Sequence, residues 1–531
     1  MNENMVKKGK FEAFIKRIEY IGNKFPHPFW LFTILALIVI LLSYLLEGVN
    51  VTYMAAKAGE APAETKAAVV SLLSYDSIRS FLSGFVRTYV NFAPLGLILT
   101  MMLGIGLVEQ TGMISALMRK TILGAPRWLV TAVIAIVGVN ANLASDAGII
   151  FTPVIAAAVF KALGRNPWVG IAAGYAAASG GFTANLFVAG TDVLLAGITE
   201  SAIRGAPNLL SSPPVNPVMN WWFMIAATFV LTFLTVYVTE KYTVKQLNDG
   251  SGTTDAEELK KHAVTPAENR GLLYAFGAIV LYIGLIVLLT YPEGSLFRAS
   301  DGTVIPTAAG VASPLLNSIM PILFFLFFFI GIAYGYGSGA IKKGEDIPKF
   351  MSKGLVGSVG FMVVVLPASL FVELFRMSRF DVILSVRGAE MLKALSLDSF
   401  PFIVILFFII LVTILNFFMM SGSAKWLILA PIFVPMFAQI GLSPALTQIA
   451  YRIGDSPGNI ITPLSYYMPV VIGLLEQYRK EGDPEVGVGT VISLGIPYAI
   501  FYLLGFILLL SIWYIVGWEL GPGVALMIPT V

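Results

Sequence analysis

The sequence contains no cysteine and only two histidines, His27 and His262. The absence of cysteine excludes disulfides, thiolate metal sites and cysteine nucleophiles. Two histidines give no basis for a histidine-rich metal or haem site, so we expect neither a metal nor a cofactor. Charged residues are also few, at 12% of the 531 residues, against about a quarter in soluble domains. The net charge of +3 is small for this length and argues against nucleic acid as a partner.

Apolar residues fill the chain instead, at 57% of the total. Runs such as FWLFTILALIVILLSYLL reach the ~20 residues that cross a bilayer as a helix. Helices are required because lipid offers no hydrogen-bond partner to an open backbone. The sequence therefore predicts an all-α polytopic membrane protein. We interpret the first apolar run as a retained helix, since it is longer than the ~7–15 residues of a signal-peptide core.

Hydropathy predicts about nine crossing segments, at residues 29–46, 94–114, 168–198, 219–240, 270–291, 315–337, 354–377, 446–474 and 488–516. Two further apolar stretches, 127–160 and 400–440, are too long for one span. Small polar residues interrupt each stretch midway, as NANLASDAG and MMSGSAKW. We expect two re-entrant helical hairpins with their tips inside the protein, where cavity or protein satisfies the irregular backbone.

The basic residues predict the orientation of the chain. With the N-terminus in the cytoplasm, the cytoplasmic segments hold 22 of the 34 lysines and arginines, as the positive-inside rule requires. The C-terminus is then external. Residues 77–92 and 380–395 look amphipathic and suit the membrane interface. The expected organisation is a cytoplasmic segment 1–28, a first half 29–240, a cytoplasmic linker 241–269 and a second half 270–531.

The two hairpin regions also match each other in sequence at an offset near 278, with one single-residue gap. The matching pairs are Ser145 and Ser423, Pro153 and Pro431, Pro167 and Pro444, Ser179 and Ser456, and Gly181 and Gly458. The hairpins enter from opposite sides in the predicted layout, so this is an inverted-topology repeat. Such repeats place substrate at mid-membrane between discontinuous helices. We expect 168–198 and 446–474 to be broken helices, unwound at 179–185 and 456–459.

Five ionisable residues lie near these interruptions: Asp146, Asp192, Lys425, Arg452 and Asp455. Each is costly in lipid, so each must face protein or water. The spacing of Arg452 and Asp455 predicts a pair on one helical face. That pair either holds the break together or attracts the carboxylate of a substrate. Asp192 has no local basic partner and is either a proton or cation carrier, a substrate acceptor, or simply solvated. Asp146 either caps a helix or handles ions.

Other polar residues near the interruptions supply oxygens for Na⁺ coordination or amide recognition. The expected ion-coupling residues are Asn140, Asn142, Asp146, Thr183 and Asn459, and Asn185 is expected to contact the substrate. Trp426 is predicted to stack on an aromatic ligand. Serine, threonine and asparagine also bridge membrane helices, which is the simpler alternative for each polar residue.

Four blocks resemble the p-aminobenzoyl-glutamate transporter (AbgT) family: NANLASDAGIIFTPV, GGFTANLFVAGTD, SGSAKWLILAPIFVPMF and YRIGDSPGNIITPLSYY. The resemblance implies a dimeric protein of the bacterial inner membrane, with a scaffold and a mobile, elevator-type transport core. It implies site roles for Asp192, Ser423, Trp426, Arg452 and Asp455. The residues that shape the site are Gly181, Pro444, Pro457, Gly458 and Pro463.

The sequence favours a secondary transporter of p-aminobenzoyl-glutamate or a similar aromatic amide carboxylate, coupled to H⁺ or Na⁺. An exporter of sulfonamide antimetabolites by ion antiport is the near alternative. A membrane-embedded hydrolase using Ser423 and Lys425 is the remote one. Those two residues are only two apart and point to different sides of a helix, so they do not form a nucleophile–base pair.

Overall fold

The computed structural model describes residues 26–55, 63–203, 215–247, 249, 263–299, 302–304, 313–480 and 485–528; nothing is described of the side chains of 54–55 and 144–146. Residues 1–25 of the predicted cytoplasmic segment 1–28, and residues 248 and 250–262 of the predicted linker 241–269, lie outside the described residues. The described part is mostly helical.

Seven helical segments of the described chain are long and apolar enough to cross a membrane. Their ranges are Pro28–Leu45, Tyr75–Gln110, Trp221–Gln246, Pro266–Leu288, Ile319–Ser338, Val359–Met377 and Val488–Val516. Each overlaps one of the seven predicted segments that carry no internal break, although Tyr75–Gln110 also includes the predicted interface segment 77–92. The two remaining predicted spans, 168–198 and 446–474, are divided into shorter helices, because small and polar residues interrupt their apolar runs. The number of membrane crossings stays a prediction.

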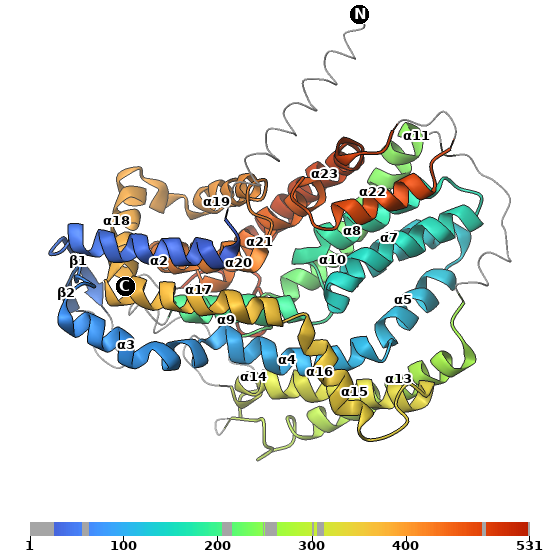
Figure 1. Cartoon of the computed structure of the whole chain (residues 1–531), viewed down its shortest axis with the longest axis horizontal. Coiled ribbons are helices and arrows are strands. Elements are labelled where there is room, and N and C mark those ends of the chain that lie inside the picture. Colours follow the sequence, from blue (N-terminus) through green and yellow to red (C-terminus); the bar gives the residue numbers. More distant parts are fainter. Residues whose placement is uncertain are drawn as a thin grey trace, which may run out of the picture.

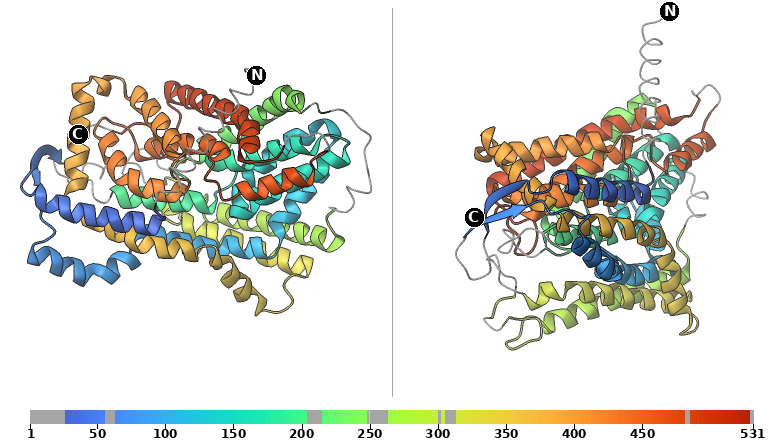
Figure 2. Two further views of the ribbon diagram at one scale, coloured as in Figure 1. Left: turned by 45° about the horizontal axis from the view of Figure 1, so that its top comes forward. Right: turned by 60° about the vertical axis from the view of Figure 1, so that its left-hand side comes forward.

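Most of the long helices run along the long axis of the molecule (Figure 1). On one side α13 (Pro266–Leu288) packs against α15 (Ile319–Ser338), which in turn packs against α4 (Ala93–Gln110). On the opposite side lie α19 (Pro401–Leu415) and α23 (Val488–Val516), as both views in Figure 2 show. The elements that carry the predicted site residues lie between these two sides.

The other elements complete the scaffold and its connections. They are α2 (Pro28–Leu45), α3 (Tyr75–Val90), α5 (Met113–Leu123), η1 (Arg127–Leu129), α10 (Trp221–Val238), the π-helix η5 (Thr239–Thr243), α11 (Val244–Gln246), α14 (Pro314–Asn317), α16 (Asp346–Val356), α17 (Val359–Met377), α18 (Phe380–Ala394) and η6 (Leu397–Ser399). The two predicted amphipathic segments are helical, as α3 and α18.

A short β-ribbon corrects the all-α prediction. Strands β1 (Asn50–Ala55) and β2 (Ala63–Ala68) pair antiparallel, with Thr52 opposite Lys66. In β1 the buried Val51 and half-buried Tyr53 alternate with the exposed Thr52. β-Branched and aromatic residues suit such a half-buried strand, and this period-2 pattern is the signal that the hydropathy reading overlooked.

In the first half the chain breaks where small polar residues predicted it. Helix α6 (Val130–Val139) passes through a 3₁₀ turn, η2 (Asn140–Ala144), into α7 (Ser145–Ala162). Helix α8 (Pro167–Gly180) ends in a second 3₁₀ turn, η3 (Gly181–Thr183), before α9 (Gly190–Ile203) begins. A Cβ on Gly181 would lie 2.6 Å from the Val139 carbonyl oxygen, so glycine is what allows η3 to approach the end of α6.

In the second half, α20 (Gly422–Ala438) follows α19 after an interruption at 416–421, which overlaps the predicted interruption 419–426 but lies earlier, since residues 422–426 already belong to α20. The predicted break at 456–459 is wrong: α21 (Pro444–Ile461) continues through Pro457 and Gly458. The chain leaves the helix only at Thr462, and α22 (Met468–Gln477) begins after Pro463 and the turn that follows it. The second broken segment therefore opens about one turn later than the sequence suggested.

Side chains from the C-terminal end of α19 support α21 in the turn that contains Pro457. Proline removes one helical hydrogen bond and displaces the carbonyls of the preceding turn. Thr413 Oγ1 donates to the Gly454 carbonyl at 3.1 Å, and Asn416 Nδ2 donates to the Asp455 carbonyl at 2.7 Å. The carbonyl that loses its helical partner at Pro457 is that of Ile453, so these donors hold the next two carbonyls of the turn rather than replace the missing bond. A Cβ at Gly458 would collide with the Asn416 side chain, so glycine is needed for this approach of α19.

Candidate functional site

Arg452 and Asp192 form a buried ion pair between the two halves of the chain. Arg452 Nη1 lies 2.6 Å from Asp192 Oδ1, and the side chains are 1% and 3% exposed. Asp192 Oδ2 also accepts a hydrogen bond from the Ala189 N–H at 2.7 Å, at the start of α9. Arg452 Nη2 donates to the Phe182 carbonyl, and the guanidinium lies 5.2 Å from the centre of the Phe182 ring. Arg452 therefore ties α21 to both η3 and α9.

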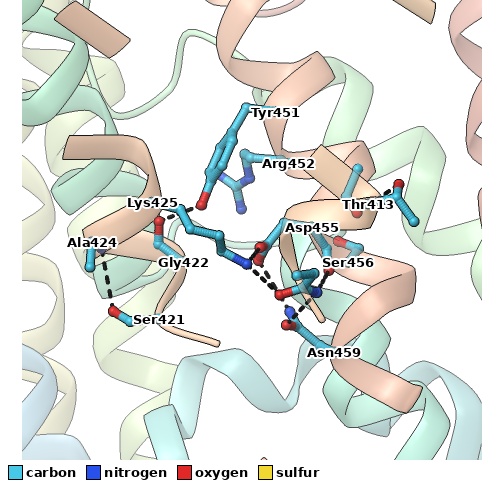
Figure 3. Close-up of polar contacts among 12 residues, drawn as sticks. Thr413, Ser421, Gly422, Ala424, Lys425, Tyr451, Arg452, Asp455, Ser456 and Asn459 are labelled. Carbon is cyan, nitrogen blue, oxygen red and sulfur yellow. Dashed lines mark hydrogen bonds and ion pairs between the residues drawn. The ribbon is translucent and has the colours of Figure 1, made fainter. Parts of the chain in front are cut away.

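A second buried ion pair joins Lys425 of α20 to Asp455 of α21 (Figure 3). Lys425 Nζ also donates to Asn416 Oδ1 at the end of α19. Asn459 Nδ2 donates to Asp455 Oδ2 at 3.2 Å, and its Oδ1 accepts from Asn416 at 3.1 Å. Four side chains from three helices thus share one hydrogen-bond network around the Asp455 carboxylate.

These two pairs correct the predicted pairing of Arg452 with Asp455. Although three residues apart on one helix, each side chain meets an opposite charge from another element. A lone buried charge is strongly destabilising, and two separate pairs neutralise all four charges. The expectation that Asp192 is unpartnered or solvated is likewise wrong. Lys425 Nζ is engaged by Asp455 and Asn416 rather than by Ser423, so the serine–lysine dyad of the hydrolase alternative does not form.

The end of α8 and the middle of α21 are joined by hydroxyl contacts. Thr183 Oγ1 donates to the Arg452 carbonyl at 2.7 Å and is hydrogen-bonded to Ser456 Oγ. Ser456 is the sequence partner of Ser179 in the proposed repeat, and it lies in the α21 turn that precedes Pro457. Thr183, predicted as an ion ligand, is thus occupied by the contact between the two halves.

Trp426 is buried within the protein rather than open to a ligand. Its ring stacks on Tyr451 with centroids 4.6 Å apart, and its Nε1 donates to Thr199 Oγ1 at 2.9 Å. The residue is fully buried, and the Tyr451 hydroxyl donates to the Gly422 carbonyl. In this structure the predicted ligand-stacking face of Trp426 is therefore taken by Tyr451.

A cavity of about 880 Å³ lies beside the two ion pairs. One part of its wall comes from the interruptions in the two halves and the other from α2, α4, α16 and α17. The interruptions contribute Asn142, Ser179, Phe182, Gly190, Thr191, Met419, Ser421, Gly422, Ser423, Asp455, Asn459, Leu464, Tyr466 and Tyr467. The facing elements contribute His27, Ile98, Met102, Glu109, Gln110, Lys353, Gly354, Ser358 and Phe361, among others. The lining mixes aromatic, thioether and polar groups.

The predicted site residues divide into those on the cavity wall and those behind it. Asn142, Ser423, Asp455 and Asn459 line the cavity. The residues that the structure buries behind the wall are Thr183, Asn185, Asp192, Trp426 and Arg452. Phe182, whose ring lies beside the Arg452 guanidinium, is part of the cavity wall. The side chain of Asp146 lies outside the described residues.

The predicted site residues Asn140 and Asn185 differ from each other in their hydrogen bonding. Asn140 uses both ends of its amide on the backbone, donating to the Ile136 carbonyl at 2.8 Å and accepting from the Leu186 N–H at 2.8 Å. It therefore fastens the chain after η3 to the end of α6. Asn185 is fully buried, and neither its amide oxygen nor its nitrogen has a partner within the described structure.

The prolines of the predicted site shape helix ends. Pro444 is the first residue of α21, capped by Ser443, whose Oγ accepts from the Leu446 N–H at 3.1 Å. Pro167, its repeat partner, is likewise the first residue of α8, which Asn166 caps. Pro463 follows the end of α21. Pro167 and Pro444 fit the first helical turn, where no donor N–H is needed.

Sequence reasoning missed four residues of this region. Asn416 is a lone amide at the end of a very apolar run, which is a signal for a buried hydrogen-bond role. Lys425 was noted at the second tip, but its partner on α21 was not. Ser179 was placed in the first predicted break and Thr191 beside Asp192, but neither was assigned to the site, since nothing in the sequence tells which way their hydroxyls point.

The chain matches the model of the AbgT putative transporter family over residues 13–528. It is 34% identical over 509 residues to the p-aminobenzoyl-glutamate transport protein of Escherichia coli K12, covering 96% of each chain. Among solved structures it resembles the Alcanivorax borkumensis YdaH transporter, with a TM-score of 0.81 and 32% identity over 94% of this chain and all of that one.

It also resembles Neisseria gonorrhoeae MtrF, whose structure is described as illuminating a class of antimetabolite efflux pumps. The TM-score is 0.85 and the identity 33%, over 96% of this chain and all of MtrF. These relatives are transporters rather than enzymes, and each matches nearly the full length of the chain. The chain thus belongs to the AbgT putative transporter family and is a multi-pass membrane transport protein.

Proposed function

We propose that the protein is a secondary active transporter of p-aminobenzoyl-glutamate or a similar aromatic amide carboxylate, coupled to H⁺ or Na⁺. The observation that carries this proposal is the cavity of about 880 Å³ between the interrupted helices and the facing elements. Small-molecule sites typically occupy ~300–1,000 Å³ and combine apolar walls with a few polar groups. Phe182, Phe361 and Tyr466 offer surfaces for an aromatic ring, and the second tip offers hydroxyls.

The moving part in this proposal is the pair of interrupted regions, 127–198 and 400–474. Contacts between them support a single body: the Arg452–Asp192 pair, the Thr183–Ser456 contact and the Trp426–Thr199 hydrogen bond each cross from one half to the other. The matched positions of Pro167 and Pro444 support an inverted repeat. We propose that this body moves past α2, α4, α16 and α17, exposing the cavity to each side in turn, as in an elevator.

Asp455 is the proposed coupling residue. It is the carboxylate of the two ion pairs that lines the cavity, whereas Asp192 is buried and is not part of the cavity wall. A proton or Na⁺ arriving from the cavity would compete with Lys425 for this carboxylate. Asn459 would be affected as well, because it donates to Oδ2 of the same carboxylate. Binding of the ion to Asp455 is then linked to the position of the start of α20, which carries Lys425.

The surroundings of the transporter are also part of the proposal. We propose a homodimer in the bacterial inner membrane, with the N-terminus cytoplasmic and the C-terminus external. The basis is the distribution of lysine and arginine along the chain and the resemblance to the family.

Transport of radiolabelled p-aminobenzoyl-glutamate into proteoliposomes tests the main proposal. A proton or sodium gradient is imposed separately, with an ionophore that collapses each gradient as the control. We expect accumulation above equilibrium under one gradient and its loss on adding the matching ionophore. An absence of flux under both gradients, in vesicles that contain folded protein, contradicts the proposal.

The likeness to MtrF favours a second candidate, export of sulfonamide antimetabolites by ion antiport. The same cavity suits a sulfonamide, which also combines an aromatic amine with acceptor oxygens. Inside-out vesicles distinguish the two functions: an exporter accumulates labelled sulfonamide when the outer solution mimics the cytoplasm, and an importer of p-aminobenzoyl-glutamate does not.

A further inference from the structure

Three residues on the wall of the cavity carry buried polar atoms without a hydrogen-bond partner. They are Asn142 Nδ2, Ser179 Oγ and Thr191 Oγ1; Ser179 Oγ has the Tyr175 hydroxyl, itself without a hydrogen-bond partner, as a neighbour. Asn142 and Ser179 are only 9% and 5% exposed. Buried polar atoms are nearly always paired, so unpaired atoms on residues that line a cavity indicate that something else supplies the partner.

We propose that Asn142, Ser179 and Thr191 form a donor subsite that binds an acceptor group of the transported solute, namely a carboxylate or the equivalent sulfonyl oxygens. The subsite deepens the proposed function and rests on it for the identity of the solute. It is built from η2, the end of α8 and the start of α9, all in the first half of the chain.

The three side chains come from elements that are fastened to one another. Helix α8 leads directly into η3, which packs against η2. The amide of Asn140, two residues before Asn142, accepts the N–H of Leu186 in the segment that leads to α9. The donors therefore sit on a preorganised part of the wall, which lowers the entropic cost of binding.

The chemistry of the unpaired atoms favours an oxygen acceptor. An amide nitrogen donates hydrogen bonds and does not ligate cations, and both hydroxyls can turn to donate. Thr191 lies in the first turn of α9, a 14-residue helix whose N-terminal end carries partial positive charge. This differs from the sequence-based expectation that Asn142 handles a coupling ion.

The charged residues that the sequence offered for this task are already engaged. Arg452 is held by Asp192 and the Phe182 carbonyl behind the wall, and Lys425 is held by Asp455 and Asn416. Releasing either cation would leave a buried carboxylate unpaired, which is strongly unfavourable. A group of neutral donors binds the acceptor group without breaking an ion pair.

The test measures binding to the purified full-length protein of p-aminobenzoyl-glutamate, its dimethyl ester and a sulfonamide. The variants are Asn142→Asp, Ser179→Ala and Thr191→Val. Matched controls are Asn91→Asp and Ser201→Ala, which lie outside this cavity; Ser201 Oγ already donates to the Gly197 carbonyl at 3.0 Å. Thermal melting without ligand identifies any variant that does not fold, and the two uncharged substitutions then carry the test.

We expect each uncharged substitution to weaken binding of the dicarboxylate by about tenfold, as for one lost hydrogen bond to a charged group. Asn142→Asp should weaken it further by repulsion, and the ester should be affected less than the acid. Unchanged affinity in all three variants overturns the subsite. Stronger Na⁺ binding by Asn142→Asp, with solute affinity intact, also overturns it and identifies a cation site.

Failure of the proposed function gives a different result. If the wild-type protein binds the sulfonamide but not p-aminobenzoyl-glutamate, and the three substitutions weaken sulfonamide binding, the subsite stands and the substrate assignment falls. If the wild-type protein binds neither solute, both proposals fall.

Discussion

Arg452 on α21 and Asp192 on α9 come from opposite halves of the chain and meet with their charged atoms 2.6 Å apart. This pair, rather than a pair within α21, is what neutralises the arginine. It places the first interrupted region against the second and holds the Phe182 carbonyl at the same guanidinium. The Arg452–Asp192 pair therefore holds the two halves of the chain together at the centre of the molecule.

Substituting one member of this pair should destabilise the protein and stop transport. Arg452→Ala and Asp192→Ala each leave an uncompensated buried charge, at a cost of about 3–5 kcal/mol. The double variant Asp192→Asn/Arg452→Gln should recover much of the melting temperature but not the transport rate, since the contact between the halves is weakened. Normal transport by both single variants would contradict the assignment of these residues to the site.

Asp455→Asn should separate ion coupling from substrate movement. The amide cannot take up a proton and attracts cations weakly, so we expect gradient-driven uptake to fall by about tenfold or more. Exchange of labelled for unlabelled substrate at equal concentrations should persist in the folded protein, although the unpaired Lys425 should lower the melting temperature. The matched control is Asp381→Asn, a carboxylate buried in α18 that does not line the cavity. Gradient-driven uptake at the wild-type rate by Asp455→Asn would remove Asp455 from the coupling step.

Asp381 also predicts a pH dependence of stability. Burial raises the pKa of its carboxyl from 3.8 to about 6, against the lowering effect of the hydrogen bond from the Val382 N–H. The folded state holds the proton more tightly than the unfolded state, so stability falls as pH rises from about 4 to about 6. Asp381→Asn should therefore raise the melting temperature at pH 8 and leave it nearly unchanged at pH 4. Equal shifts at both pH values would contradict this.

Trp426 should prove to be a packing residue. Trp426→Ala removes the stack on Tyr451 and the hydrogen bond to Thr199, and we expect a loss of about 3–5 kcal/mol in stability. Trp426→Phe keeps most of the apolar contact, so it should fold and transport with an unchanged KM. A large rise in KM for Trp426→Phe, without a lower melting temperature, would instead restore the predicted stack on the substrate.

The fold was readable from the sequence wherever one apolar run forms one helix. Seven such runs matched helices, and NANLASDAG and MMSGSAKW marked real interruptions, because small polar residues do not sustain a long apolar helix. Pro457 and Gly458 misled the same reasoning. In the structure α21 continues through them, and Thr413 and Asn416, which lie about 40 residues earlier, donate to the neighbouring Gly454 and Asp455 carbonyls.

The amino-acid sequence alone determined that this is a membrane protein. It also determined where the apolar helices are interrupted and which few charged residues are buried near the interruptions. Hydropathy and helix-breaking residues act over short stretches, so the order of residues suffices for them. Only the tertiary structure decided that Arg452 pairs with Asp192, that Lys425 pairs with Asp455, and which hydroxyls face the cavity. Those contacts join residues from distant helices, and their geometry depends on how the helices pack rather than on local spacing.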